Sequence, residues 1–454
     1  MVFEAIIEQA AKNLPVTTMV RSLLEQSLNA SALDELFEEY RRLQYAREVL
    51  FSSIVHLLSL VVSKVRPSFN AAVMAIVEDI KVSKQALWAK INRTDPEVSA
   101  ALVRISALRL ATIIEKLGPL PPALIPGYRT FILDGNCIAA SQHRLKVLRK
   151  TSSGPLPGKV VAVLDPQKHL VLDIIPALDG HAQERSLLPA IFERIAPGDL
   201  WVGDRNFCTT EFFAQAQERG AFVLFREHKN LPWAPCSEPT AADSSGRLFE
   251  QSVRIPTSCG DIIARRIIIH LEKPTRDGDL FIVVLTTVPA EHASATLIAD
   301  QYANRWSIEE HFHMMSRAFD AEIPSMGVPK AALLALAVGF VAANIVAVIH
   351  AAIQVAHPEI DVEETVSKIK IAEEVQCTYG GMMALTGPQA WEAFQELTEA
   401  EMAAWLRRCA ANIVLPRFRK AVRGPKKPTP KRSLYKGSTH VSTQRLLQQA
   451  TVAR

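Results

Sequence analysis

The chain has 454 residues, 48% of them hydrophobic and 22% charged, which indicates a globular protein with room for two to four domains. Its six cysteines are scattered without CxxC spacing. This pattern excludes a zinc ribbon and a disulfide framework and fits a reducing cytoplasm. Acidic residues stand where the cationic segment of a signal peptide would be, so we expect no signal peptide.

The formal net charge of +4 is unevenly distributed along the chain. Residues 411–454 contain eleven Lys or Arg and no Asp or Glu, which leaves 40 basic against 47 acidic residues elsewhere, a charge of about −7. A basic, Pro-rich tail on an acidic body indicates a polyanionic partner such as nucleic acid, with a solvated, disordered end as the alternative. The residues expected to neutralise DNA phosphates without reading sequence are Arg417, Arg419, Lys420, Arg423, Lys426 and Lys427.

Residues 1–125 are predicted to be entirely helical, because apolar residues recur at helical spacing and no segment alternates apolar and polar residues. Ser83 is a suitable N-cap for a short helix over residues 84–91. Leu87 and Ile91 would face the core. The opposite face could read DNA in the major groove, as in a helix-turn-helix protein, and the alternative is a helix that only supports the fold. The residues expected on that exposed face are Lys84, Gln85, Trp88 and Lys90.

After a Gly-Pro-rich break at residues 118–123, the pattern changes to strands separated by helices. Two acidic residues, Asp134 and Asp204, directly follow apolar strands. Active groups of α/β sheets gather at strand ends, although a single Asp there is more often a turn former or a helix cap. The strands are predicted at residues 129–133, 159–165, 169–175, 199–203 and 221–225, with a helix over 209–219.

Residues 227–289 are predicted to form an antiparallel β insertion that interrupts the α/β domain. Three segments, 247–255, 261–272 and 279–288, alternate apolar and polar residues, and Gly260 marks a turn between the first two. The chain then returns to the α/β domain through a helix.

Residues 300–319 are predicted to form that helix as one amphipathic element with two neighbouring faces. A carboxylate on the polar face borders the core without entering it, where a packed scaffold can hold a catalytic or metal-ligating group. The alternative is a surface helix with an ion pair between Arg305 and Glu309. The polar face comprises Tyr302, Arg305, Glu309, His313 and Ser316, and the apolar stripe comprises Ile308, Phe312, Met315 and Phe319.

Residues 331–355 contain no Asp, Glu, Lys or Arg and are long enough to cross a membrane. Asn344 and Gln354 interrupt the segment, and its ends lack aromatic belts. We therefore interpret it as a buried core helix that packs behind the helix of Glu309. Further helices are expected over residues 362–374 and 388–410.

Asp134, Asp204 and Glu309 would repel one another if they converged without a counter-charge. Mg²⁺ removes that difficulty, because it prefers carboxylate oxygens and water and leaves positions open for phosphate. Two such ions about 3.5–4 Å apart can activate a water or a 3′-hydroxyl and stabilise the leaving oxygen. The three acids are therefore the minimum set for in-line attack on a phosphodiester.

Along the chain, two strand ends that carry Asp are followed by a Tyr-x2-Arg-x3-Glu motif. The residues are Asp134 with Gly135, Gly203 with Asp204 and Arg205, and then Tyr302, Arg305 and Glu309. Over roughly residues 125 to 325, this pattern resembles the DDE transposases of bacterial insertion sequences. In particular it is similar to the branch with a Tyr-Arg-Glu-Lys signature and a β-strand insertion in a ribonuclease H-like catalytic domain.

The resemblance implies an α/β fold in which a β-rich insertion interrupts a ribonuclease H-like catalytic domain. An all-helical domain that binds DNA ends would precede it, and a helical, basic C-terminal region would follow. The expected boundaries are 1–125 for the N-terminal domain, 126–226 and 290–356 for the catalytic domain, 227–289 for the insertion, 357–410 for the C-terminal helices and 411–454 for the basic tail.

The resemblance also implies roles for single residues. Asp134, Asp204 and Glu309 would be the catalytic residues and would bind two Mg²⁺ ions, for which Mn²⁺ could substitute. Tyr302 and Arg305 would contact DNA phosphates at the transposon end.

Two arginines are further expected phosphate contacts. Arg205 follows the second Asp, and its guanidinium can bond a phosphate bidentately. The chain departs from the family at Ser316, where the signature has Lys seven residues after the Glu. Serine can bond a phosphate oxygen but supplies no charge, so either the neighbouring Arg317 reaches the DNA or the contact is lost.

Four other residues near these motifs are assigned no part in the chemistry. Trp306 and Trp233 are expected to pack in the interior, with stacking on a flipped base as the alternative. His181 and His311 are left out of the metal set, because the chemistry requires no histidine ligand.

We therefore expect a transposase that binds terminal inverted repeats, cuts double-stranded DNA and joins the freed 3′-hydroxyl to target DNA. A homodimer is the simplest way to process two ends together, and we expect it in the bacterial cytoplasm and not in a membrane. A metal-dependent nuclease of the same fold without strand transfer would share the three acids and stays open. So does a non-catalytic DNA-binding regulator.

Overall fold

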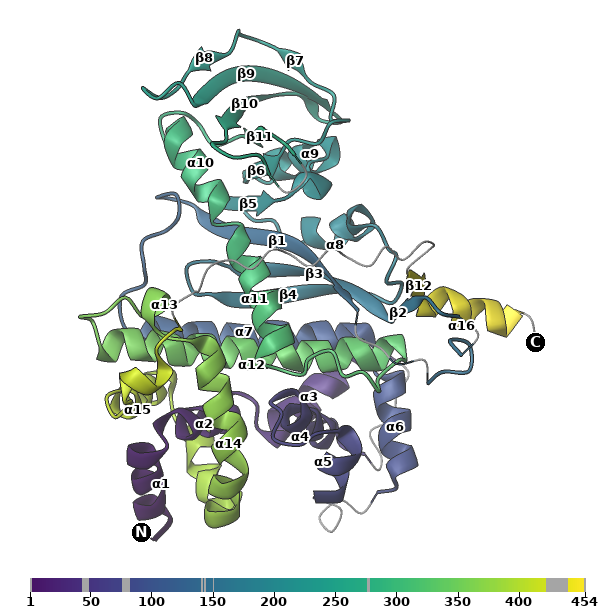
Figure 1. The fold of residues 1–454 in the computed structure, drawn as a ribbon, viewed down its shortest axis with the longest axis vertical. Helices are drawn as coiled ribbons and strands as arrows, with labels where there is room; N and C mark the ends of the chain where they lie inside the picture. The colour runs from purple at the N-terminus through teal and green to yellow at the C-terminus, as the bar shows by residue number, and fades with distance from the viewer. Residues whose placement is uncertain are drawn as a thin grey trace.

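The computed structural model describes residues 2–42, 49–75, 82–139, 142, 144–149, 151–275, 278–421 and 440–452. A ten-stranded mixed sheet runs through the molecule, and helices from both ends of the chain pack beneath it (Figure 1). Buried apolar residues of the N-terminal helices, the sheet and the C-terminal helices form one continuous hydrophobic core. These parts therefore stabilise one another.

The N-terminal region is helical throughout its described residues, which confirms the prediction. Its helices are α1 (Val2–Asn13), α2 (Pro15–Ser27), α3 (Ala30–Tyr40), α4 (Phe51–Val62), α5 (Phe69–Ala75), α6 (Lys84–Arg93) and α7 (Pro96–Leu117). The last of these lies against the sheet, and the others form a layer below it (Figure 1).

Helix α6 differs from its prediction at Lys90 and at Trp88, which is half-buried against Phe69. Ser83 caps it as predicted, by accepting a backbone hydrogen bond of 3.2 Å, and Leu87 and Ile91 are buried. Lys90, expected on the exposed face, is also buried, and its ammonium lies 3.5 Å from the ring centroid of Phe37. That prediction was wrong because α3 covers a side of α6 that an isolated helix would leave in water.

The strands of the sheet follow the order β4-β3-β1-β5-β6-β11-β10-β9-β7, and β8 pairs with β9. β1 is antiparallel to β3 and parallel to β5, which is parallel to β6. Each predicted strand is present. β1 extends five residues beyond its predicted end, and the other strands shift by a few residues at most. The bounds are β1 (Arg129–Ile138), β3 (Gly158–Asp165), β4 (Leu170–Ala177), β5 (Asp199–Gly203), β6 (Phe222–Arg226), β7 (Ala234–Pro235), β8 (Thr240–Ala241), β9 (Leu248–Thr257), β10 (Gly260–His270) and β11 (Phe281–Thr286).

The strands of the predicted insertion continue the same sheet. β11 pairs antiparallel with β6, with Leu285 opposite Phe225, and β10 and β9 follow outward. This pairing satisfies the backbone groups on the edge of β6 that would otherwise face solvent. The insertion is therefore rigidly continuous with the strands that carry the two aspartates.

Helices cover both faces of the central strands. On one face, α7 and the long helix α12 (Pro329–Ala356) pack on β3 and β4. On the other face, α8 (Leu188–Phe192) and α9 (Thr210–Glu218) enclose an aromatic cluster with β5 and β6. Two short 3₁₀ turns, η1 (Glu184–Leu187) and η2 (Arg205–Phe207), lie beside these helices and contact each other.

Residues 300–319 belong to two helices, so the prediction of a single helix was wrong. α10 (Ala295–Ala303) ends where the backbone N–H groups of Asn304 and Arg305 bond the carbonyls three residues earlier, and α11 (Trp306–Arg317) begins directly after them. Such i→i+3 bonds tighten and close a last helical turn. The break lies at Asn304 and Arg305, just before Glu309.

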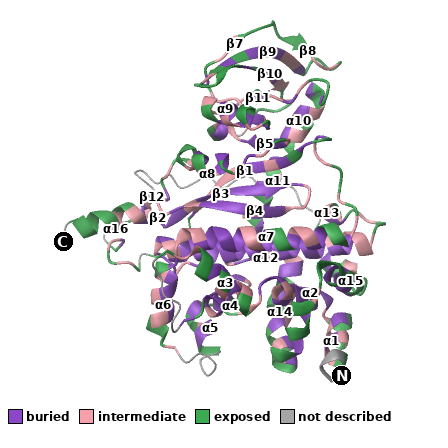
Figure 2. Cartoon of the chain, turned by 180° about the vertical axis from the view of Figure 1, so that it is seen from behind, coloured by how far each residue is buried: buried purple, intermediate pink, exposed green. Residues whose placement is uncertain are grey.

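Helix α12 is the core helix that the sequence predicted. Among the described residues it is the one helix long and apolar enough to cross a membrane, but 94% of its apolar window is buried inside the protein. Figure 2 shows it as a buried bar beneath the sheet. α11 packs on it through Phe312 and Phe340, whose ring centroids lie 6.2 Å apart.

The C-terminal region adds helices and then a short strand in a separate two-stranded sheet. Its elements are α13 (Val362–Thr365), α14 (Lys368–Thr386), η3 (Gln389–Glu396), α15 (Glu399–Ala410), η4 (Leu415–Phe418), β12 (His440–Ser442) and α16 (Thr443–Val452). β12 pairs in parallel with β2 (Gly154–Leu156), and Arg445 of α16 bonds Asp179 at 2.7 Å. The alternative of a disordered end is therefore wrong for residues 440–452.

Candidate active site

Asp134 lies within β1, four positions before its end. The prediction that the strand ends at residue 133 was wrong, because it continues to Ile138. The carboxylate accepts a hydrogen bond of 2.8 Å from the backbone N–H of Gly135. Burial raises the pKa of Asp134 to about 6, Arg305 opposes that shift, and Glu309 adds to it. A half-buried acid of this kind binds a proton or a cation more readily than an exposed one.

Asp204 directly follows β5 and precedes η2. β1 and β5 are parallel neighbours in which Leu133 pairs with Gly203, so Asp134 and Asp204 each follow one member of the same pair. Gly203 leaves no room for a side chain, because an added Cβ would lie 3.0 Å from the Phe207 ring. The register of the sheet therefore brings the two aspartates to one place.

Glu309 lies in the first turn of α11, and Arg305 links it to the sheet. One guanidinium nitrogen of Arg305 lies 3.0 Å from the Glu309 carboxylate and another lies 3.4 Å from that of Asp134. Arg305 is only 8% exposed, and it is close enough to Asp204 for their charges to interact. Two of the predicted acids, Asp134 and Glu309, thus contact one buried guanidinium, and Asp204 interacts with its charge.

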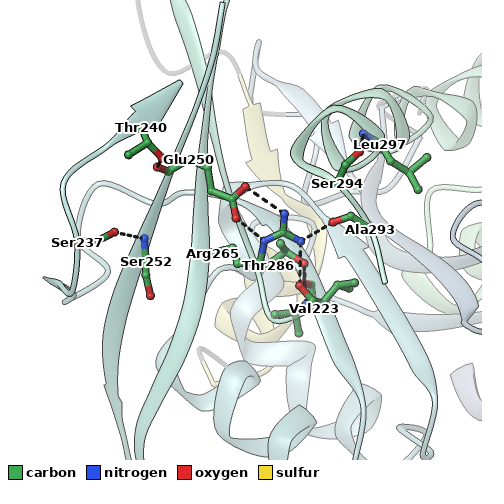
Figure 3. A network of polar contacts seen from close by, with 11 residues as sticks. Val223, Ser237, Thr240, Glu250, Ser252, Arg265, Thr286, Ala293, Ser294 and Leu297 are labelled. Carbon is green, nitrogen blue, oxygen red and sulfur yellow. Dashed lines mark hydrogen bonds and ion pairs between the residues drawn. The ribbon is translucent and has the colours of Figure 1, made fainter. Parts of the chain in front are cut away.

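A polar clamp in the extended sheet fixes the start of α10 and hence the position of Arg305. The guanidinium of Arg265 on β10 bonds the carboxylate of Glu250 at 2.6 Å and the carbonyl of Ala293 at 2.7 Å (Figure 3). Ser294, the next residue, caps α10 by accepting from the backbone N–H of Leu297. The insertion strands therefore support the helices that carry the site.

The signature tyrosine is buried in this structure. Tyr302 is 4% exposed, and burial raises the pKa of its hydroxyl well above the usual range. Neither Tyr302 nor Arg305 presents its polar group to solvent as a phosphate contact would. Their predicted DNA contacts therefore require a rearrangement and stay predictions.

The donor chemistry of the site fits a hard divalent ion, because carboxylate oxygens are the ligands that Mg²⁺ prefers. The present arrangement is nevertheless closed around Arg305. Within the part of the chain that the structure describes, no three His, Cys, Asp or Glu side chains lie close enough to hold a metal ion. Metal binding at Asp134 and Glu309 therefore requires the Arg305 guanidinium to move.

A fourth acid, Glu184, lies beside the site and was not predicted from the sequence. Glu184, the first residue of η1, bonds Asn206 at 2.9 Å and Lys159 at 3.2 Å. It also adds to the raised pKa of Asp134. The local sequence around Glu184 has no strand or helix periodicity that would mark it, and the one available signal was its place in the first turn after β4.

The remaining predicted contacts are distributed over the surface. Arg205 is half-buried, and Arg317 is exposed at the end of α11. Ser316 is exposed and donates its hydroxyl to the carbonyl of His313 at 3.0 Å. Of the predicted tail residues, Arg417, Arg419 and Lys420 are exposed, whereas Arg423, Lys426 and Lys427 lie outside the described residues.

The four residues given no role differ in their surroundings. Trp306 is 59% exposed, so its predicted packing was wrong, because the helix break turns it outward. Trp233 is half-buried with the Arg266 guanidinium 4.8 Å from its ring, as packing predicts. His181 is exposed, and His311 is buried beneath α11.

Part of the chain is similar to a known family of domains. Residues 125–323 match the family model of the transposase DDE domain. No curated protein matches the chain. The matched segment contains Asp134, Asp204 and Glu309, and the mixed sheet and helical N-terminal region are consistent with it. The match supports a DDE transposase, a DNA-cleaving enzyme of a family that generally uses divalent metal ions.

Proposed function

We propose that this chain, with the transposase domain at residues 125–323 as its catalytic part, is the transposase of a bacterial insertion sequence. It binds the terminal inverted repeats, cuts the DNA at their ends and joins the freed 3′-hydroxyls to target DNA. The main support for this proposal is that Asp134 and Glu309 both contact Arg305, whose charge also interacts with Asp204.

The strand order supports a ribonuclease H-like catalytic domain of the Tyr-Arg-Glu-Lys signature branch. Two antiparallel strands, β3 and β4, flank β1 on one side, and two parallel strands, β5 and β6, flank it on the other. The acids stand on the central strand, after its parallel neighbour and on a helix that follows the insertion. This placement matches the family pattern that the sequence suggested.

In the proposed reaction, Asp134, Asp204 and Glu309 hold two Mg²⁺ ions, with Mn²⁺ as a substitute. Bound divalent ions supply a nucleophilic water or 3′-hydroxyl and stabilise the leaving oxygen. Arg305 leaves the acids and donates to a DNA phosphate, for which a buried guanidinium already held in place is well suited. Tyr302, Arg205 and Arg317 would add phosphate contacts beside it.

The DNA ends are proposed to contact the helical region of residues 1–125 and the basic tail of residues 411–454. The exposed Arg417 and Arg419 belong to that tail, and cations at such positions neutralise phosphates without reading bases. We propose that a homodimer in the cytoplasm pairs the two transposon ends.

The direct test incubates the full chain with duplex DNA that carries the inverted repeat of its own element, supercoiled target plasmid and Mg²⁺ or Mn²⁺. We expect nicked ends and joined products from the wild type and neither from Asp204→Ala. Glu211→Ala, which removes an exposed acid of α9, should retain both products. Nicks without joined products would show a nuclease, and unchanged products from Asp204→Ala would overturn the proposal.

A further inference from the structure

Glu184 of η1 stands at the edge of the candidate site, over Gly135 of β1 and in contact with Asn206 of η2. We propose that Glu184 is a fourth acid of the active centre: a positioning residue that ties the turn after Asp204 to the backbone beside Asp134 and strengthens divalent-cation binding there. The inference rests on the proposed metal-dependent transposase function.

The first supporting contact reaches the turn of Asp204. One carboxylate oxygen of Glu184 accepts a hydrogen bond of 2.9 Å from the side-chain amide of Asn206, two residues after Asp204. The following residue, Arg185, donates from its guanidinium to the backbone carbonyl of Asn206 at 3.2 Å. Two bonds from η1 thus hold η2, and η2 begins at Asp204.

The second supporting contact lies over β1. A Cβ atom added to Gly135 would overlap the Glu184 carboxylate, so this carboxylate occupies the space above the residue that follows Asp134. Gly135 has ordinary strand pairing and no positive φ. The backbone conformation therefore does not demand glycine here, and a side chain at this position would displace the Glu184 carboxylate.

The ion pair between Lys159 and Glu184 offers a purely structural role as the alternative. Lys159 lies 3.2 Å from Glu184, and both side chains are about one-eighth exposed, at 13% and 14%. A purely structural Lys159–Glu184 pair would stabilise the fold without changing the affinity for metal ions.

Mn²⁺ binding to the full chain separates these two roles, because free and bound Mn²⁺ differ in their electron paramagnetic resonance signals. We expect Glu184→Gln and Asn206→Ala each to weaken Mn²⁺ binding by about tenfold, as expected for residues that orient metal ligands. The same variants should raise the Mg²⁺ concentration for half-maximal end cleavage. Glu193→Gln, which changes an exposed acid at the end of α8, is the matched control and should change neither value.

Thermal unfolding of each variant shows whether weaker Mn²⁺ binding comes from loss of the fold. Gly135→Ala provides an independent route, since it leaves Glu184 in the chain but displaces its carboxylate, and it should reproduce the weaker Mn²⁺ binding. If folded Glu184→Gln and Asn206→Ala bound Mn²⁺ as tightly as the wild type, the inference about Glu184 would be overturned. Cleavage by the wild type would still support the transposase function. Absence of Mn²⁺ binding and of cleavage in the wild type would instead overturn the proposed function.

Discussion

The guanidinium of Arg305 lies 3.0 Å from the carboxylate of Glu309, one helical turn further along the chain. The same guanidinium reaches Asp134 on β1 at 3.4 Å. It therefore supplies the positive charge that three converging acids require when no other cation is bound. Arg305, the arginine of the signature, thus pairs with acidic side chains in this structure and is proposed to pair with a phosphate in the DNA complex.

Arg305→Gln should make the protein depend on divalent cations for stability. Removal of the guanidinium leaves the half-buried Asp134 without its counter-charge, which should cost about 1–2 kcal/mol of unfolding free energy. Half-exposed Glu309 contributes little to this loss because water screens it. In thermal melts, Mg²⁺ should stabilise the variant more than the wild type.

The control is Arg317→Gln, at the exposed end of the same helix. Its melting temperature should stay near that of the wild type, with and without Mg²⁺. An equal response of Arg305→Gln and wild type to Mg²⁺ would contradict the role of Arg305 as an internal counter-ion.

Gly339→Val should destabilise the support beneath Glu309. A Cβ atom on Gly339 of α12 would overlap Ala321 and approach the methyl group of Met315 in α11, so the segment that directly follows α11 must shift. Overpacking of this kind costs about 1–3 kcal/mol. Urea denaturation measures the loss, and end cleavage should fall with it because α11 carries Glu309.

Gly380→Ala, also a substitution of a helix glycine, should increase the free energy of unfolding. Nothing lies within 4 Å of a Cβ atom at Gly380, which is exposed inside α14. Alanine in a helix interior is favoured over glycine by about 0.5–1 kcal/mol, so this variant should be more stable than the wild type. A destabilised Gly380→Ala would show that α14 has an undetected constraint at this turn.

Asn344→Leu should unfold more easily although it makes α12 more apolar. The buried side-chain amide of Asn344 donates to the carbonyl of Val171 and accepts from its N–H, both at 2.8 Å. Leucine leaves both backbone groups of this residue of β4 without these bonds, which costs about 2–4 kcal/mol. Asn230→Leu, at an exposed position, should change the unfolding free energy by less than about 0.5 kcal/mol.

The protein should lose stability as the pH falls below about 6.5, partly through His311. Burial lowers the pKa of His311 to about 3, with smaller effects from Lys368 and His169. An unfolded chain takes up this proton near pH 6.5, whereas the folded chain does so only near pH 3. Stability is therefore complete above pH 6.5 and decreases between these values.

His311→Leu should reduce this dependence on pH. Urea denaturation between pH 7 and pH 4, a range chosen around the ordinary histidine pKa, should show a shallower loss for the variant than for the wild type. The exposed His181→Leu is the control and should keep the full slope. Equal slopes for wild type and His311→Leu would mean that other groups carry the acid sensitivity.

Local sequence patterns predicted most elements of the fold. β5 has the predicted bounds of residues 199–203, and the strands of the insertion lie within a few residues of theirs. Strand alternation and helix spacing are properties of neighbouring residues, so the sequence displays them directly. The same patterns could not show the break at Arg305, because the residues around it keep helical spacing through the turn.

The candidate site was predicted in part. The sequence indicated Asp134, Asp204 and Glu309 by their places after strands and on a helix, and their metal ligation stays a prediction. Glu184 was missed because it lies in a polar turn without periodicity, and its partner Asn206 is 22 residues away. A contact of that kind depends on how β1, η1 and η2 pack.

By itself, the sequence determined the order of the elements, the burial of α12 and the positions of three acids along the chain, because these follow from spacing and local hydrophobicity. Only the tertiary structure decided that Arg305 lies between acids from a strand 171 residues away and from its own helix. It also decided that the insertion extends the main sheet. Strand pairing and ion pairs join residues that are distant in the chain, and no local pattern records their partners.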